Sequence, residues 1–207
     1  QESRGLGDVY KRQILFVTGL NYVKADDDLV SIDKSAPDFT LVDYKGNNIK
    51  LSDFKGKYVV LEWINFDCPF VKKHYESKNM QTLQNTYTEM GVIWLSICSS
   101  APGKQGHFSN DEIAKRIANL SAKMNYYLID EDGKVGKMYG AKTTPHIFII
   151  NPNQTLIYAG GIDDIPSSKQ EDIEKANNYV VEILTAAMNN QPIKNKTTKP
   201  YGCSVKY

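Results

Sequence analysis

Apolar and polar residues follow one another along the chain in a pattern that predicts an α/β domain. Residues 58–64 and 92–97 are β-branched, aromatic or aliphatic almost throughout, as in strands that are covered on both faces of a sheet. Residues 70–90 between them are expected to form one helix, with Pro69 suited to its first position and Gly91 to its end. Such a βαβ unit crosses over right-handedly and places its active ends at the C-terminal edge of the strands.

Further segments extend this pattern on both sides of the βαβ unit. The alternation and the turn residues predict two hairpins, over residues 39–51 and 146–159. A loop over residues 99–109 should border the C-terminal edge of the sheet, near Cys68. Another strand and three helices are also predicted: 126–130, a helix that begins after Ser109, 135–139 and 170–188. This order predicts a central mixed β-sheet with helices on both faces and an N-terminal β-hairpin extension.

Composition narrows the possible functions. The 207 residues are 41% hydrophobic, which is enough for one domain with a sizeable core. A formal net charge of +1 gives no electrostatic reason to expect nucleic acid as a partner, and no apolar stretch is long enough to span a bilayer. The three cysteines are too few for a disulfide scaffold, and no Cys/His cluster has zinc spacing. We therefore expect neither a metal nor a cofactor.

The first 25 residues do not have the pattern of a folded domain. Residues 1–13 resemble translated vector sequence, and residues 14–25 resemble the end of a secretory signal, with small residues at the spacing that a signal peptidase accepts. We expect an exported protein, periplasmic or extracellular; the alternative is a cytoplasmic protein with an ordinary N-terminal arm. The chain is thus divided into a leader, a domain and a tail: 1–25, 26–190 and 191–207.

Cys68 lies where the first buried strand ends and the long helix begins. A thiol at a helix N-terminus faces unpaired backbone N–H groups and the positive end of the helix dipole, which favour the thiolate. Lys72, Lys73 and His74 add positive charge in the first turn, and Asp67 opposes them. We interpret Cys68 as a reactive thiol; the alternative is a buried, inert cysteine.

Three motifs lie where predicted strands begin or end. Cys68-Pro69 follows a strand, Thr143-Thr144-Pro145 precedes another, and Ala36-Pro37-Asp38-Phe39 opens the domain. Taken together, they resemble the thioredoxin superfamily, and within it the peroxiredoxin-like (redoxin, AhpC/TSA) branch. The resemblance runs from about residue 35 to residue 189. It implies a thioredoxin-like fold and a redox-active cysteine.

The sequence departs from this resemblance around Cys68. Val71 takes the place of the second cysteine of Cys-x-x-Cys, so a dithiol cycle within the motif is impossible. Asn65 replaces the hydroxyl residue that activates a peroxiredoxin cysteine and is the candidate hydrogen-bond donor. Arg116, the only arginine after the leader, lies on a predicted surface helix, so the guanidinium that polarises a peroxide has no obvious counterpart. Peroxide and protein disulfide both remain open as substrates.

The resemblance also implies roles for an acid and a proline. Glu62 lies in an apolar strand, where thioredoxins carry a buried acid that relays protons, and burial would raise its pKa; the alternative is an acid on a wet face. The Thr144-Pro145 bond is expected to be cis and, together with Pro69, to form the surface that binds a substrate chain. The alternative is a trans proline at the start of an edge strand.

Cys203 lies beyond the last helix, in a polar tail. We expect this tail to be mobile, so that Cys203 reaches a sulfenic acid or a mixed disulfide on Cys68 and resolves it. Peroxiredoxin-like proteins often keep such a cysteine in the same chain or in a dimer partner. The alternative is an incidental terminal cysteine. Cys98 is interpreted as a filler at the end of its strand; the alternative is a cysteine that lies near Cys68.

Two classes of function follow from these residues. In the first, the protein is a thiol oxidoreductase: Cys68 attacks a peroxide or a protein disulfide, and Cys203 resolves the product for an external thiol reductant such as a thioredoxin, in a monomer or a homodimer. In the second, it is a catalytically weak thioredoxin-fold binding module that presents Thr144 and Pro145 to a partner. Only the first class needs Cys203 within disulfide reach of Cys68, and we favour it.

Overall fold

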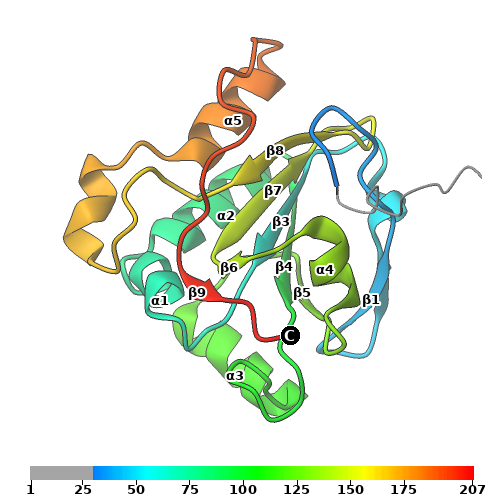
Figure 1. Cartoon of the computed structure of the whole chain (residues 1–207), viewed down its shortest axis with the longest axis vertical. Helices are drawn as coiled ribbons and strands as arrows, with labels where there is room; N and C mark the ends of the chain where they lie inside the picture. Colours follow the sequence, from blue (N-terminus) through cyan, green and yellow to red (C-terminus); the bar gives the residue numbers. More distant parts are fainter. Residues whose placement is uncertain (1–29) are drawn as a thin grey trace, which may run out of the picture.

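The computed structural model describes residues 30–207 (Figure 1). The predicted leader, residues 1–25, and the export signal expected within it lie outside the described residues. Among the described residues, no helix is long and apolar enough to cross a membrane.

A seven-stranded mixed sheet forms the centre of the molecule, in the order β2-β1-β5-β4-β3-β7-β8. Strands β3, β4 and β5 are parallel, and the pairs β1–β2, β1–β5, β3–β7 and β7–β8 are antiparallel. This confirms the predicted mixed sheet and both hairpins. The strands are β1 (Thr40–Asp43), β2 (Asn48–Lys50), β3 (Val59–Trp63), β4 (Ile93–Cys98), β5 (Tyr126–Ile129), β7 (His146–Ile150) and β8 (Leu156–Gly160).

Helices cover both faces of this sheet, as predicted (Figure 1). Side chains from α1, α2, α3 and α5 pack in one core cluster, and side chains from α4 pack with the N-terminal hairpin in the other. The helices are α1 (Pro69–Glu76), α2 (Asn79–Glu89), α3 (Asn110–Leu120), α4 (Lys134–Tyr139) and α5 (Tyr179–Met188), with short 3-10 turns η1 (Leu51–Phe54) and η2 (Gln170–Lys175).

Strand β3 connects the two cores. All five of its residues are buried, and the alternation of a strand sends successive side chains to opposite faces. Val60 packs in the core under α1 and α2, whereas Leu61 and Trp63 pack in the core under α4. An apolar run of this kind is typical of a central strand, and it ends at the turn that leads to Cys68.

Two predicted helices are wrong in their extent. The segment 70–90 forms two helices, because Lys78 has a positive φ of 65° and the Ser77 hydroxyl bonds the carbonyl of His74. The segment 170–188 is interrupted between η2 and α5, where Asn178 caps α5 by accepting a hydrogen bond from the Val181 N–H. Asn178 also forms a β-bridge with Asp163, which holds this break against the body of the domain.

A second, two-stranded sheet lies beside the C-terminal edge of the main one. It pairs β6 (Thr143–Thr144) with β9 (Cys203–Ser204), a strand of the C-terminal tail. In Figure 1 the tail descends in red from α5, passes α1 and ends near α4. The expectation of a mobile tail is therefore wrong, because this segment is fixed by backbone pairing and by side-chain contacts along its length.

Candidate active site

Cys68 is the N-cap residue of α1, and Pro69 follows at the first helical position. The Cys68 carbonyl accepts hydrogen bonds from the N–H groups of Val71 and Lys72, at 3.0 and 2.9 Å, which begins the helix. The Cys68 thiol is fully buried and donates a hydrogen bond to the Thr144 carbonyl, at 3.0 Å. The predicted junction of strand, cysteine and helix is confirmed, and its thiol is directed at the loop before Pro145.

The charge around Cys68 differs from the expectation. Lys73 and His74 both point to Asp163: the Lys73 ammonium lies 3.4 Å from its carboxylate and His74 Nε2 lies 3.7 Å away. Burial and the neighbouring Lys73 lower the pKa of His74 to about 3, so the imidazole is neutral near pH 7. These two side chains consequently do not act as free cations beside the thiol.

The peptide bond between Thr144 and Pro145 is cis, as predicted. It follows β6, whose edge pairs with β9 so that Thr144 stands opposite Cys203. Burial and the neighbouring Cys68 thiol together raise the pKa of Cys203 to about 11. Cys203 itself is only half-buried, whereas Cys68 is covered completely.

Tyr201 anchors the tail on one side of Cys203. Its hydroxyl donates a hydrogen bond to Asp163 at 2.5 Å and accepts one from the Lys73 ammonium at 3.4 Å. It also lies 3.3 Å from His74 Nε2. Its ring meets Phe70 edge to face, with ring centroids 5.9 Å apart. We call the group of side chains that meets here the Asp163 cluster: Lys73, His74, Asp163 and Tyr201.

Tyr207 anchors the tail on the other side of Cys203. Its hydroxyl donates to the Ala141 carbonyl at 2.8 Å, and its ring lies so close to Gly133 and Gly136 that a Cβ atom on either would overlap it. The Lys206 carbonyl accepts a hydrogen bond from the Ala101 N–H, at 2.9 Å. The two tyrosine anchors therefore hold the segment that contains Cys203 across the N-terminus of α1.

Asn65 supports the turn rather than the thiol. Its side-chain oxygen accepts from the Asp67 N–H at 3.0 Å, and its side-chain nitrogen donates to the Gln105 carbonyl at 3.1 Å. Its own carbonyl accepts from the Cys68 N–H. Asn65 thus connects the turn before Cys68 to the 99–109 loop, which borders the site as expected.

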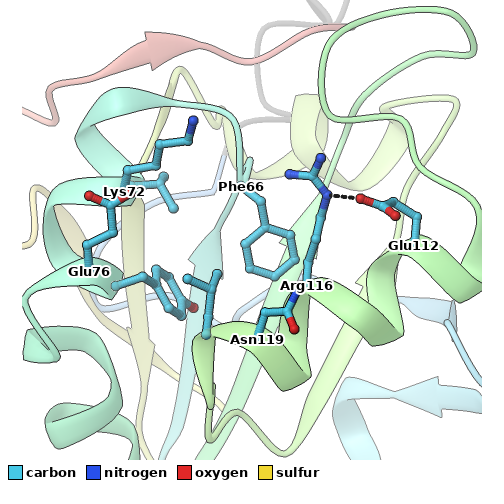
Figure 2. Close-up of a pocket in the computed structure, with 9 residues that line it drawn as sticks. Phe66, Lys72, Glu76, Glu112, Arg116 and Asn119 are labelled. Carbon is cyan, nitrogen blue, oxygen red and sulfur yellow. Dashed lines mark hydrogen bonds and ion pairs between the residues drawn. The ribbon is translucent and has the colours of Figure 1, made fainter.

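Arg116 belongs to α3, and its side chain reaches the turn before Cys68. Its guanidinium binds Asp67 and Glu112, each at 2.7 Å, and stacks over the Phe108 ring. Figure 2 shows Arg116 beside Phe66, at a hollow of about 300 Å³ whose rim also bears charged side chains. The Arg116 guanidinium is thus paired with two carboxylates and is not directed at the thiol. It holds Asp67, the residue before Cys68, in place.

Glu62 is fully buried, and the alternative of a wet face is wrong. Its carboxylate accepts hydrogen bonds from four side chains: Tyr75, Gln84, Trp94 and Ser96. Burial raises the pKa of Glu62, as expected, while these four donors act in the opposite direction. We call these five side chains the Glu62 cluster. Tyr75 connects it to α1, the helix that begins at Cys68.

Cys98 lies at the end of β4 and is 5% exposed. Its thiol donates to the Gly106 carbonyl at 3.4 Å, and burial raises its pKa. This agrees with its interpretation as a filler. The described cysteines are all free in this structure.

Sequence reasoning missed the Asp163 cluster. The sequence predicts Lys73 and His74 as positive charges in the first turn of the helix, and it indicates no role for Asp163 or Tyr201. A signal did exist, since Tyr201 and Gly202 directly precede Cys203 in a segment with few other apolar residues. That signal indicates a tail that packs, although it does not indicate where.

The parallel strands β3, β4 and β5, the antiparallel β7 and β8, the cis-proline and the cysteine at the start of α1 define a thioredoxin-like fold. The model of the AhpC/TSA family matches residues 32–159, which is more than half of the chain. The chain belongs to this family.

Known proteins agree with this family and fold. The chain is 25% identical over 142 residues to the thiol-disulfide oxidoreductase ResA of Halalkalibacterium halodurans. This match covers 68% of this chain and 75% of the relative. An uncharacterized conserved protein from Geobacillus kaustophilus is 29% identical with a TM-score of 0.71, over 86% of this chain and 92% of that one. A hypothetical protein from Sinorhizobium meliloti has the same TM-score at 22% identity, over 86% and 95% of the two chains, and shows the fold alone.

Proposed function

We propose that this protein is a thiol-dependent oxidoreductase in which Cys68 and Cys203 form the redox pair. The observation that carries the proposal is the pairing of β9 with β6, which sets Cys203 opposite Thr144 while the Cys68 thiol bonds the carbonyl of Thr144. Membership of the AhpC/TSA family and the likeness to a thiol-disulfide oxidoreductase support the same class of chemistry.

In the oxidising half of the cycle, the Cys68 thiolate attacks the substrate. A disulfide substrate gives a mixed disulfide on Cys68 and releases a thiolate; a hydroperoxide gives a sulfenic acid and releases water or an alcohol. Cys203 then loses its proton and attacks the Cys68 sulfur. The Cys68–Cys203 disulfide forms, and the second substrate thiol, or water, leaves.

In the reducing half, an external thiolate attacks the Cys68–Cys203 disulfide. We infer that it attacks Cys203, because this residue is half-buried in the reduced structure whereas Cys68 is fully covered. The Cys68 thiolate is also the better leaving group, since it departs into the N-terminus of α1. A second external thiolate then attacks the external sulfur of the mixed disulfide on Cys203; the Cys203 thiolate leaves, and the two external thiols depart as a disulfide.

The other predicted site residues take supporting roles in this proposal. The Thr144 carbonyl, before Pro145, holds the Cys68 thiol. Pro69 starts the helix, and Asn65 fixes the turn before the cysteine. Glu62 is proposed as a proton store. Its described hydrogen bonds do not include Cys68, so we propose that it is connected to α1 through Tyr75.

The binding-module alternative has less support. Such a module would present the edge beside Thr144 to a partner segment, and β9 of the same chain lies along that edge. An occupied edge with a second thiol on the occupying strand favours the oxidoreductase.

Disulfide mapping and turnover test the proposal. Reduced full-length chain is treated with hydrogen peroxide or with oxidised glutathione, and bonds are mapped by mass spectrometry. We expect a Cys68–Cys203 link; Cys68→Ser should abolish turnover with dithiothreitol, and Cys203→Ser should stop at a modified Cys68. Cys98→Ser is the matched control and should retain turnover. A Cys68 that reacts with neither oxidant would refute the proposal.

A further inference from the structure

The edge of β6 beside the active cysteine already carries an extended strand. Thr143 pairs with Ser204 and Thr144 with Cys203, in antiparallel register, and the Val205 N–H donates to the Lys142 carbonyl at 3.1 Å. Proteins that bind an extended peptide by strand addition use backbone groups of this kind at an open edge. Here the chain's own tail fills that position.

The approach between the two strands is close. A Cβ atom at Gly202 would overlap the Thr144 carbonyl, and Gly202 has a φ of +136°, which a residue with a side chain rarely adopts. Glycine therefore allows the tail to touch the backbone that also accepts the Cys68 hydrogen bond. The tail therefore lies directly against the carbonyl group that holds the Cys68 thiol.

Anchors at both ends keep this strand in place. The Tyr201 hydroxyl is held in the Asp163 cluster, and Tyr207 is held by the Ala141 carbonyl and by its packing on α4. A polypeptide that pairs with β6 must displace β9, and this disturbs the Tyr201 anchor, which lies only two residues before Cys203. A small molecule needs only a local opening next to Cys203, which is half-buried.

We propose that residues 200–207 are a built-in substitute for a substrate strand and select small oxidants over polypeptide disulfides at Cys68. The inference rests on the proposed function and names the substrate class of the same site. A disulfide or hydroperoxide with little attached to it reacts with the intact chain. A disulfide within an extended polypeptide reacts only after Tyr201 has left the Asp163 cluster.

Two probes with the same reacting bond test this selection. One is the mixed disulfide of cysteine with 5-thio-2-nitrobenzoate, and the other is a short extended peptide with the same mixed disulfide on a central cysteine. In each, the Cys68 thiolate attacks the cysteine sulfur and expels the coloured thionitrobenzoate, which is the better leaving group. A Cys98→Ser/Cys203→Ser background leaves Cys68 as the reacting thiol, and stopped-flow absorbance gives both rate constants.

With the tail intact, we expect the small probe to react about tenfold or more faster than the peptide, because the peptide also requires the opening of the tail. Adding Tyr201→Ala should raise the peptide rate and bring the two rates within about threefold of each other. The milder Tyr201→Phe should give an intermediate ratio. Tyr44→Ala, on the turn between β1 and β2, is the matched control and should leave the ratio unchanged.

The possible outcomes separate the two proposals. Equal rates for both probes in the intact background would overturn the selection by the tail while leaving Cys68 as a reactive thiol. A ratio that Tyr201→Ala and Tyr201→Phe both leave unchanged would overturn it as well. If neither probe reacts with Cys68, the proposed oxidoreductase function is refuted, and the selection by the tail is refuted with it.

Discussion

The Glu62 cluster and the Asp163 cluster both include side chains of α1, but they connect this helix to different parts of the molecule. Tyr75 of α1 donates to Glu62, whose other partners lie on β4 and α2. Lys73 and His74 of α1 meet Asp163 and Tyr201, which lie beyond β8 and in the tail. One cluster thus ties α1 to the sheet and the other ties it to the strand with Cys203.

The difference lies in the charges as well as in the partners. Glu62 is an acid whose hydrogen-bond donors are all neutral side chains. These hydrogen bonds favour its ionised form, whereas burial favours its neutral form. Asp163 has the Lys73 ammonium at 3.4 Å, with a neutral imidazole and a phenol beside it. The first arrangement serves the fold, and the second makes the position of the tail depend on a buried ion pair.

The largest expected effect is on the Glu62 cluster. Glu62→Leu removes the acceptor of four buried donors, and we expect it to lower the free energy of unfolding by about 3–4 kcal/mol in urea denaturation. Ser96→Ala removes one donor only and should cost about 1 kcal/mol. A smaller loss for Glu62→Leu than for Ser96→Ala would contradict the role given to the carboxylate.

A smaller but local effect is expected for the Asp163 cluster. Tyr201→Phe removes the hydroxyl that donates to a buried carboxylate, and it should lower the free energy of unfolding by about 1.5–3 kcal/mol. Because the tail is then held less firmly, Cys203 should be alkylated faster by iodoacetamide in a Cys68→Ser/Cys98→Ser background. Ser96→Ala in that background should not change the alkylation rate, and equal acceleration by both would show general loosening instead.

The smallest expected effect is the pH dependence, which has opposite signs in the two clusters. The native pKa of His74 is lowered from 6.5 to about 3, so the unfolded chain binds more protons between these values and stability falls as the pH falls below 6.5. Between about pH 7 and about pH 5.5 this group should contribute a loss of roughly 1 kcal/mol, which His74→Gln removes.

The pKa of Glu62 is raised above 4.5, so its contribution is present below that value and is lost as the pH rises through the native pKa. Glu62→Gln should remove the pH dependence of stability that comes from Glu62 and leave the one that comes from His74. Urea denaturation across pH, compared between each variant and the parent chain, measures both slopes. Slopes of the same sign would refute the assignment.

Local patterns were sufficient to predict much of the fold and part of the site. The apolar run of β3, Cys68-Pro69 and the Thr144-Pro145 bond are each determined largely by neighbouring residues, and they were identified from sequence. The sequence does not indicate the break at Lys78, because this residue adopts a left-handed conformation with a φ of 65° although it is not a glycine. Propensity favours a continuous helix there.

The placement of the tail was not predictable in the same way. Tyr201 contacts Lys73 and His74 across 128 and 127 positions of sequence, and Asp163 across 38. Nothing in the periodicity of residues 191–207 indicates such partners, and their polar composition is also typical of a mobile segment. The cysteine was recognised as a candidate from its chemistry, while the means of holding it required the structure.

The contact between Cys68 and Cys203 has a topological consequence. The two residues are about 135 positions apart, so a bond between them would close a ring that contains α1 to α5 and β4 to β9. In the chain-entropy account, closing a ring of this length stabilises the folded state by roughly 4–5 kcal/mol. Oxidation would therefore do more than remove two electrons: it would turn most of the domain into a covalent loop, and the reduced and oxidised proteins would differ in their resistance to heat and to proteases.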